Sequence, residues 1–567
     1  MQRLQLHWPV LLTLPLAFIL YGSGVYYGLP QHFDTDEFAF IGGAGRLLSD
    51  RTLDPGWYGS PAQTLMYLLA VIFAGVIGFG LLTGRFESLS AAQLAYRNDT
   101  TPFIASGRFA MCLIAVAQIA VTYLVMRKLR IRGWVSALLL LSLVFSPLLV
   151  SFASIIRMDI LQSTLQMTIV LLCISALDGP RPARGLIIAG AVVGLSVSTK
   201  YPGVVSCIPI IVTAGVLLAR ARFTLSRSIG VLLASAGAAL VASFLSGPFL
   251  FLNFAGVLEN VAFEARSAQA GATSAGFFPA LGYYLLEILP ENLGWPVVAL
   301  AALGVLRATR DAPGWIVLSM FFSYVAFISA LSLSWERWAL PLFPLAVVLA
   351  GFGAEALLSV SQRARIAAVA VVAAAMVGSL ALTGPGTVGS AVARWQNDDT
   401  RIIADRLLAD IVSNGGGVAI ETQAPSLDTA RYGVYYSQDG ALLEWSERSD
   451  LRRPIGYMSY LANGWEGDFD AFRAAMEARG VDYLILTGYS DLFFEDRALF
   501  PEDAEFYAQL LEASEPVCEI GRSFARLGPE ISIRRLTEPG AAVPPCPSLD
   551  QELAGNRAAQ AAVARRE

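Results

Sequence analysis

The sequence predicts an α-helical polytopic membrane protein with about eleven transmembrane helices, interfacial helices in the first outer loop and a C-terminal extracytoplasmic mixed α/β domain. Of the 567 residues, 55% are hydrophobic and 15% are charged, and the mean hydropathy of +0.57 exceeds what a soluble globular protein carries. Twelve apolar runs occupy the first 383 residues. Residues 1–393 hold 23 basic and 16 acidic side chains, whereas 394–567 hold 17 and 29. A membrane body therefore precedes an acidic soluble region.

The apolar runs are the candidate membrane helices, because about 17–20 apolar residues suffice to cross the hydrocarbon core. Only 185–198 is marginal. The first run is followed by bulky Tyr26 and Tyr27 in place of a small-residue cleavage site, so we expect it to remain as a helix and not to be a signal peptide. The runs lie near residues 9–28, 62–82, 107–126, 133–151, 160–177, 185–198, 203–219, 229–251, 292–306, 315–333, 338–358 and 366–383.

The positions of basic residues between these runs predict the orientation. Clusters of Arg and Lys recur after every second helix, which assigns them to the cytoplasmic side: residues 127–132, 181–184, 220–227, 307–310 and 363–365. Parity then allows no second crossing between 29 and 106, so we expect the run 62–82 to lie at the interface. Eleven helices span, the N-terminus is cytoplasmic, and the stretch after 383 is outside.

The chain is predicted to divide into a catalytic membrane domain at 1–385, an α/β domain at 390–540 and a flexible tail at 541–567. In the second domain, β-like runs at 417–421, 482–486 and 530–534 alternate with helical patterns near 398–413, 468–479 and 502–513. The segment Asn414-Gly-Gly-Gly417 is a helix-to-strand turn. Cys518 and Cys546 would be able to form a disulfide if this domain is extracytoplasmic, and the sequence leaves that open.

Scarce residue types limit the chemistry. The chain has two histidines, His7 and His32, and two lysines, Lys128 and Lys200. This argues against a histidine-rich metal site and against a serine–histidine hydrolase. The formal net charge of −5 gives no general basic surface for nucleic acid.

Acidic residues of the membrane body gather on one predicted side, since 13 of its 16 carboxylates fall on the outer face. Acids also fill outer loops simply because basic residues avoid them, and for most positions that explanation is favoured. The first outer loop is denser, with Asp34, Asp36 and Glu37 directly after a membrane helix. Such a cluster suits a general base or a cation site, or else a solvated helix cap formed by Asp34 or Thr35.

Three further outer segments carry cations. Arg157 and Asp159 lie between two predicted helices. They either form a local ion pair, or Arg157 binds a phosphate and Asp159 orients the first loop. Lys200 is one of two lysines among 40 basic residues, so a general positive charge would almost always be an arginine in this chain. The lysine therefore favours a specific phosphate contact. Arg337 violates the orientation bias of outer loops and is a candidate for the same role, although its aromatic neighbours are also typical interface anchors.

Two loop segments are candidates for an acceptor site or lid. Trp57 and Tyr58 lie in a Gly/Pro-broken stretch that leads into the interfacial helix. Glu264 and Arg266 lie in the long outer loop 252–291, which is either a lid over an outer cleft or only a connector.

Over roughly residues 9–380 these motifs resemble the glycosyltransferase C superfamily, in its branch of protein O-mannosyltransferases and bacterial lipid-A aminoarabinose transferases. The resemblance rests on four elements in order: the acidic pair Asp36-Glu37, Asp159 at the outer start of the fourth helix, the turn Thr199-Lys200-Tyr201-Pro202, and Arg337-Trp338-Ala339-Leu340-Pro341.

The resemblance implies an inverting glycosyltransferase in a bacterial inner (plasma) membrane. It would move a sugar from a polyprenyl-phosphate carrier to a lipid, glycan or protein acceptor at the outer face. Asp36, Glu37 and Asp159 would be catalytic, with Asp36 as the base, and Lys200 and Arg337 would hold the donor phosphate with help from Arg157. We expect no tightly bound metal; a divalent cation, if one binds, would use Asp34, Asp36 and Asp159.

Two other functions compete with this interpretation. A transporter or flippase of a lipid-linked sugar would also need outer charges, but it predicts polar groups deep in the helices and internal repeats, and neither is evident. A non-catalytic membrane assembly subunit would explain every motif as interfacial anchoring. The sequence does not define the sugar or the acceptor.

Overall fold

The computed structural model describes residues 8–31, 34, 36–59, 61–359, 364–445, 460–522, 526–536 and 546. The chain forms two compact units, one comprising Met1–Pro30 and Asp36–Asn397 and the other Gln31–Thr35 and Asp398–Glu567. Apart from Cys546, the predicted flexible tail at 541–567 lies outside the described residues, as do His7, His32 and Thr35.

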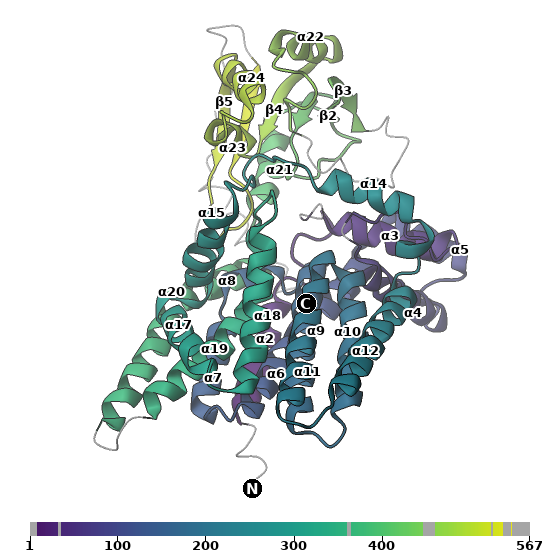
Figure 1. The fold of residues 1–567 in the computed structure, drawn as a ribbon. Coiled ribbons are helices and arrows are strands. Elements are labelled where there is room, and N and C mark those ends of the chain that lie inside the picture. Colours follow the sequence, from purple (N-terminus) through teal and green to yellow (C-terminus); the bar gives the residue numbers. More distant parts are fainter. Residues whose placement is uncertain are drawn as a thin grey trace. The chain divides into compact units, whose positions relative to one another are not determined.

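The first unit is helical, and each predicted apolar run corresponds to a helix in it (Figure 1). Its N-terminal half contains α2 (Trp8–Gly22), α3 (Glu37–Ser49), α4 (Gln63–Leu82), α5 (Leu89–Asn98), α6 (Thr101–Lys128), α7 (Gly133–Val144), α8 (Pro147–Phe152), α9 (Met158–Asp178), α10 (Pro182–Thr199), η1 (Tyr201–Ser206) and α11 (Cys207–Ala219). Its C-terminal half contains α12 (Leu225–Ser246), α13 (Phe249–Leu252), α14 (Phe254–Glu264), α15 (Phe277–Gly282), η2 (Tyr283–Ile288), α16 (Leu289–Leu293), α17 (Trp295–Ala308), α18 (Ala312–Ser329), η3 (Glu336–Ala339), α19 (Leu342–Leu358) and α20 (Arg365–Gln396).

The protein is a polytopic membrane protein. Among the described residues, eight helices are long and apolar enough to cross a membrane, namely α4, α6, α9, α10, η1 with α11, α12, α18 and α20. Four shorter apolar helices are α2, α7, α17 and α19. Helix α4 has 20 residues, so its length alone would permit a crossing. Its interfacial placement, the total of eleven crossings and the orientation stay predictions.

Several helices differ in extent from the apolar runs that predicted them: α2 already ends at Gly22, and the run 229–251 is divided into α12 and α13. The run 133–151 is split into α7 and α8, because Pro147 cannot continue a helix and the Ser146 hydroxyl caps the second piece. Helix α20 extends well beyond the predicted end at 383 and passes through Pro385 to Gln396. Hydropathy marks the apolar part of a helix and not its end.

Close packing of α10 against α12 holds one side of the unit together (Figure 1). A Cβ atom at Gly190 or Gly194 would collide with the backbone oxygens of Ser235 and Ala239. Small residues four apart let two membrane helices approach to backbone contact, and packing replaces the hydrophobic effect that water would supply.

The second unit is a mixed α/β domain, so the predicted fold class is confirmed. Its helices are α21 (Thr400–Ile411), α22 (Phe469–Arg479), α23 (Tyr489–Glu495) and α24 (Pro501–Glu512), and its strands are β1 (Gly417–Ile420), β2 (Gly433–Gln438), β3 (Ala441–Glu444), β4 (Val481–Leu486), β5 (Ser514–Ile520) and β6 (Ile531–Leu536). The sheet order is β3-β2-β1-β4-β6-β5. Strand β1 is parallel to β2 and β4, and the other pairs are antiparallel.

The sequence pattern predicted three of these strands and three of these helices, and it missed β2, β3, β5 and α23. The signal for the β2–β3 hairpin was present, since Asp439-Gly440 forms its two-residue turn with φ angles of 51° and 73°. Asp-Gly is a preferred sequence for such turns.

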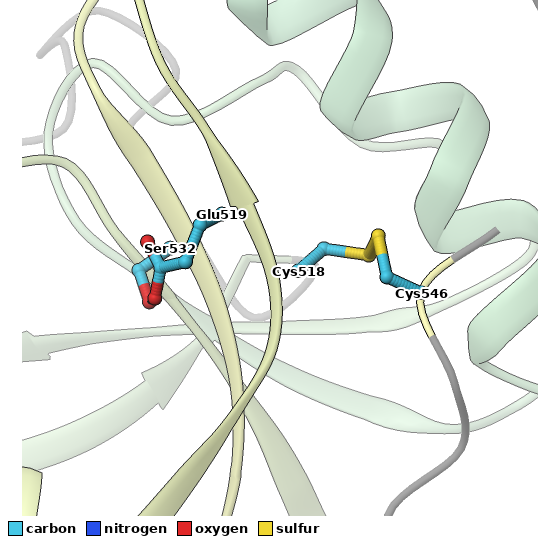
Figure 2. The surroundings of a disulfide bond; sticks show 4 residues. All are labelled: Cys518, Glu519, Ser532 and Cys546. Atoms are coloured by element: carbon cyan, nitrogen blue, oxygen red, sulfur yellow. A yellow bond between two sulfur atoms is a disulfide. The ribbon is translucent and has the colours of Figure 1, made fainter. Parts of the chain in front are cut away.

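A disulfide bond joins Cys518 on β5 to Cys546, which are 28 positions apart (Figure 2). On the same strand, Glu519 accepts a hydrogen bond of 2.6 Å from the Ser532 hydroxyl of β6. The cysteine pairing that the sequence left open is therefore present.

Candidate active site

Asp36 immediately precedes α3 and points into a group of cations. Its Oδ2 atom lies 2.5 Å from Arg157 Nη1 and 3.9 Å from Arg337 Nη2. Its side chain makes no cap hydrogen bond to α3, although Asp36 occupies the cap position. Asp34 falls in the second unit, so its position relative to Asp36 is not described.

Asp159 and Lys200 form a second pair, with 2.5 Å between Oδ1 and Nζ. Both side chains are buried, at 2% and 9% exposure. Arg157 and Asp159 are two residues apart at the start of α9, yet one reaches Asp36 and the other reaches Lys200. It is thus Arg157, and not Asp159, that contacts the first loop.

A tight turn after α10 positions the Lys200 side chain. The Lys200 backbone N–H donates to Ser196 O at 2.9 Å, and Gly203 N–H donates to Lys200 O at 2.8 Å. A Cβ atom at Gly203 would lie 2.5 Å from the Ser196 backbone, so only glycine fits there. The ammonium also lies 5.5 Å from the centre of the Trp338 ring, within range of a cation–π contact.

Arg337 lies in η3, the short turn that leads into α19. Its guanidinium is 4.4 Å from the centre of the Trp335 ring. The turn is anchored by Tyr324 of α18, whose hydroxyl donates to Trp338 O at 3.1 Å. The predicted outer aromatic residues therefore support the two cations in addition to any role at the interface.

Glu37 lies in a different environment from its neighbour Asp36. Its carboxylate accepts from Arg108 Nε at 2.9 Å and Nη2 at 2.5 Å, and from Ile156 N–H at 2.8 Å. Arg108 Nη1 donates to Tyr27 O at 2.6 Å. Both side chains are almost fully buried, at 2% for Glu37 and 4% for Arg108. This geometry favours a structural role for Glu37 over the predicted catalytic one.

The sequence analysis missed Arg108. A signal was available, because Arg108 is a cation at the predicted outer end of a membrane helix and violates the same orientation bias that drew attention to Arg337.

Glu264 of the predicted lid belongs to this site. Its carboxylate is 3.8 Å from Arg266 and lies within electrostatic range of Asp36 and Arg337. Burial raises the pKa of Glu264 above its ordinary value, while Arg266 lowers it. A side chain at Gly59 would meet the Glu264 Cγ atom, so the first loop packs directly on this carboxylate.

Tyr58 and Trp57 connect the first loop to the rest of the unit. The Tyr58 hydroxyl donates to Asp54 at 2.5 Å, and its backbone N–H donates to Asn260 of α14 at 3.0 Å. Burial is the main cause that raises the pKa of Tyr58, to about 12. Trp57 packs edge-on against Phe40 of α3. These contacts make both residues part of the wall that joins α3 to α14.

The glycine-rich part of the long outer loop is hydrogen-bonded to the segment before Arg337. Ser274 N–H donates to Ser332 O and Ser334 N–H donates to Ala272 O, each at 2.8 Å. Arg266 donates to Gln269 at 2.8 Å. The loop and the Arg337 turn therefore form one connected element.

Within the residues that the structure describes, no group of three or more His, Cys, Asp or Glu side chains is arranged to hold a metal ion. In the site, Asp36 and Asp159 each have a cationic side chain at 2.5 Å. A divalent cation stays an open alternative.

The comparisons with known proteins agree with the motifs. Residues 103–246 match the family model described as dolichyl-phosphate-mannose-protein mannosyltransferase. Over these residues the match agrees with the predicted resemblance to the protein O-mannosyltransferase branch. The matched stretch contains Arg157, Asp159 and Lys200, whereas Asp36 and Arg337 lie outside it. No curated protein sequence matches the chain.

Solved structures of membrane glycosyltransferases resemble the chain at low identity. ArnT from Cupriavidus metallidurans is 14% identical with a TM-score of 0.49, covering 93% of this chain and 97% of that one. The archaeal oligosaccharyltransferase AglB from Archaeoglobus fulgidus is 13% identical with a TM-score of 0.47, covering 86% and 71%. The arabinofuranosyltransferase AftD from Mycobacteria is 14% identical with a TM-score of 0.44, covering 95% and 40%. All three TM-scores are below 0.5, so they support no assignment of residues.

Proposed function

We propose that this protein is an inverting glycosyltransferase that moves a sugar from a polyprenyl-phosphate carrier to a lipid, glycan or protein acceptor at the outer face of a bacterial inner membrane. The observation that carries the proposal is the cluster of Asp36, Arg157, Arg337, Asp159 and Lys200 at one end of the membrane helices. The family match over residues 103–246 supports the same class of reaction.

The charges of the cluster suit a phosphodiester donor. Three cations, Arg157, Lys200 and Arg337, surround two carboxylates, Asp36 and Asp159, while Glu264 has its own partner in Arg266. The surplus of one positive charge matches the single negative charge of a polyprenyl phosphosugar. As the bond to the sugar breaks, charge builds on the departing phosphate, and cations already in position stabilise it without reorganisation.

Asp36 is the proposed base. It takes the proton of the acceptor hydroxyl while that oxygen attacks the anomeric carbon, and the bond between this carbon and the phosphate oxygen breaks with its electron pair leaving on the phosphate. Arg157 holds the carboxylate turned into the site. Asp159 orients Lys200, and Glu37 with Arg108 positions the start of α3. Glu37 is thus a positioning residue.

The location of the cluster suits a lipid-linked donor. The isoprenoid chain remains in hydrocarbon beside the apolar helices, while the phosphate and sugar reach polar groups at the helix ends. The outer face is supported by the distribution of basic residues and by the disulfide between Cys518 and Cys546, since disulfides persist in oxidising compartments. The C-terminal unit would then be periplasmic.

The proposal is tested with full-length protein in nanodiscs, using a panel of radiolabelled undecaprenyl-phosphate sugars and an envelope extract as acceptor. Asp36→Asn should lower transfer by about 10²–10⁴-fold with donor binding retained, because Asn cannot take the proton while the cations proposed to hold the phosphate remain. Lys200→Ala should weaken donor binding. Asp50→Asn, at the other end of α3, is the matched control and should transfer at the normal rate. Unchanged transfer by Asp36→Asn would overturn its role as base.

A further inference from the structure

Arg394, near the end of α20, is a buried cation outside the proposed active site. The residue is 8% exposed. Its Nη2 atom donates to Ser151 Oγ at 2.9 Å and its Nη1 atom to Ser390 Oγ at 3.4 Å. The guanidinium is 6.0 Å from the centre of the Tyr27 ring, and a Cβ atom at Gly24 would lie 3.7 Å from Arg394 Cδ. Three segments therefore enclose it: the turn after α2, the end of α8 and α20 itself.

Arg394 has no carboxylate partner among the described residues. The other well-buried cations differ in this respect, since Arg108, Lys200 and Arg401 each have a carboxylate oxygen at 2.5 to 2.8 Å. Removing a charge from water without a counter-ion is unfavourable, and two hydroxyl groups compensate only part of it. An anion bound beside Arg394 would compensate this buried charge.

The shape of the site favours a phosphate. A guanidinium presents paired N–H groups that match two oxygens of a phosphate. Ser151 accepts from Arg394, which leaves its hydroxyl hydrogen able to donate to a further oxygen, whereas the Ser390 hydroxyl already donates to Thr387 O at 3.0 Å. One guanidinium and one hydroxyl donor therefore face the same side.

The surroundings indicate a lipid as the source of that phosphate. Trp395 and Tyr26, next to the site, are 60% and 67% exposed. Amphipathic rings of this kind concentrate at the headgroup level of a membrane. Along the last four turns of α20 before Arg394, the large exposed side chains are apolar: Leu382, Val388 and Val392. Such a surface suits acyl chains.

We propose that Arg394 and Ser151 bind the phosphate of an anionic lipid headgroup at the junction of α2, α8 and α20, separately from the donor site, with Ser390 holding the guanidinium in place. Tyr27 links this site to the buried ion pair, because its ring faces Arg394 and its carbonyl oxygen accepts from Arg108. A bound lipid therefore stabilises the turn after α2, whose Tyr27 carbonyl oxygen contacts the Arg108 partner of Glu37.

The test measures lipid binding by native mass spectrometry of the full-length protein in detergent, with phosphatidylglycerol as the probe. Arg394→Gln should weaken binding of phosphatidylglycerol roughly tenfold or more, because charge-assisted hydrogen bonds are lost. Ser151→Ala with Ser390→Ala keeps the charge and should weaken binding less, which preserves the test if Arg394→Gln fails to fold. Arg365→Gln removes an exposed arginine at the other end of α20 and should have no effect.

Separate arms distinguish the source of the phosphate. Phosphatidylcholine should bind with little dependence on Arg394, because its headgroup carries no net charge. Inorganic phosphate should not displace phosphatidylglycerol at equal ionic strength. Displacement that depends on Arg394 would overturn the lipid assignment in favour of free phosphate. Equal binding of phosphatidylglycerol to the native protein, Arg394→Gln and the double serine variant would overturn the site itself.

Discussion

Glu37 in the membrane unit and Glu421 in the C-terminal unit are both buried carboxylates, and the two regions stabilise them by different means. Glu37 is buried, with 2% of its side chain exposed, and is paired with the Arg108 guanidinium. Glu421 is 2% exposed and directly follows β1, at the carboxyl edge of the parallel strands. Among the described residues it has no cationic partner; its carboxylate accepts from Thr487 N–H at 2.6 Å, from the Thr487 hydroxyl at 3.2 Å and from the Tyr507 hydroxyl.

The neutral partners of Glu421 have a consequence for its titration. Burial raises the pKa of Glu421 to about 7, and its hydrogen bonds offset only part of this rise. Glu37 instead faces a guanidinium, which stays charged at any working pH. Burial beside neutral donors alone therefore makes the Glu421 carboxylate sensitive to pH near neutrality.

Removal of the Arg108 cation should have the largest effect. We expect Arg108→Gln to lower stability by about 3–5 kcal/mol, because Glu37 would remain buried without its counter-ion. The shift in the unfolding midpoint of the purified protein measures this. Arg85→Gln, which removes an exposed arginine, is the control. Glu37→Gln combined with Arg108→Gln should recover part of the loss, and a loss below 1 kcal/mol in the single variant would show that the pair is not buried.

The second prediction concerns pH. The unfolded chain releases the Glu421 proton near pH 4.5 and the folded chain near pH 7. Proton release therefore favours unfolding across this window, and stability of the C-terminal unit should fall as pH rises from 4.5 to 7, by on the order of 3 kcal/mol from this group.

Hydrogen exchange of β1 and β4, corrected for the intrinsic pH dependence, measures that change in the full-length protein. The Glu421→Gln variant should lack the part of the pH dependence that comes from the Glu421 carboxylate. Asp503, whose pKa burial raises to about 6, contributes in the same direction, so the Asp503→Asn variant separates the two groups. If the stability of the Glu421→Gln variant depends on pH as that of the native protein does, Glu421 is not the titrating group and the contrast with Glu37 is wrong.

An exposed ion pair should give the smallest effect. Arg473 and Glu477 lie one helical turn apart on α22, 3.2 Å from each other, with 43% and 67% of their side chains exposed. Glu477→Gln should change stability by less than about 0.5 kcal/mol in chemical denaturation of the full chain. A loss comparable to that of Arg108→Gln would mean that burial is not what separates strong from weak pairs here.

Much of the fold was predictable because its signals are local. Each apolar run gave a helix, since about 20 apolar residues in sequence can satisfy their backbone only as a helix within a membrane. The Asp439-Gly440 turn carried an equally local signal that was not used. By contrast, the split at Pro147 and the extension of α20 to Gln396 depend on capping and on contacts beyond the apolar stretch.

The sequence by itself determined which residues were available for chemistry: a scarce lysine, Lys200, an arginine against the orientation bias, Arg337, and the carboxylates Asp36 and Asp159. Only the tertiary structure decided their partners. Arg157 contacts Asp36, which lies more than a hundred residues away in the sequence. Asp159 forms its ion pair with Lys200 and not with its near neighbour Arg157. Residue type and spacing define a helix and its end, but the rotation of that helix and the path of the loop beside it are set by packing, and these select the side chains that meet.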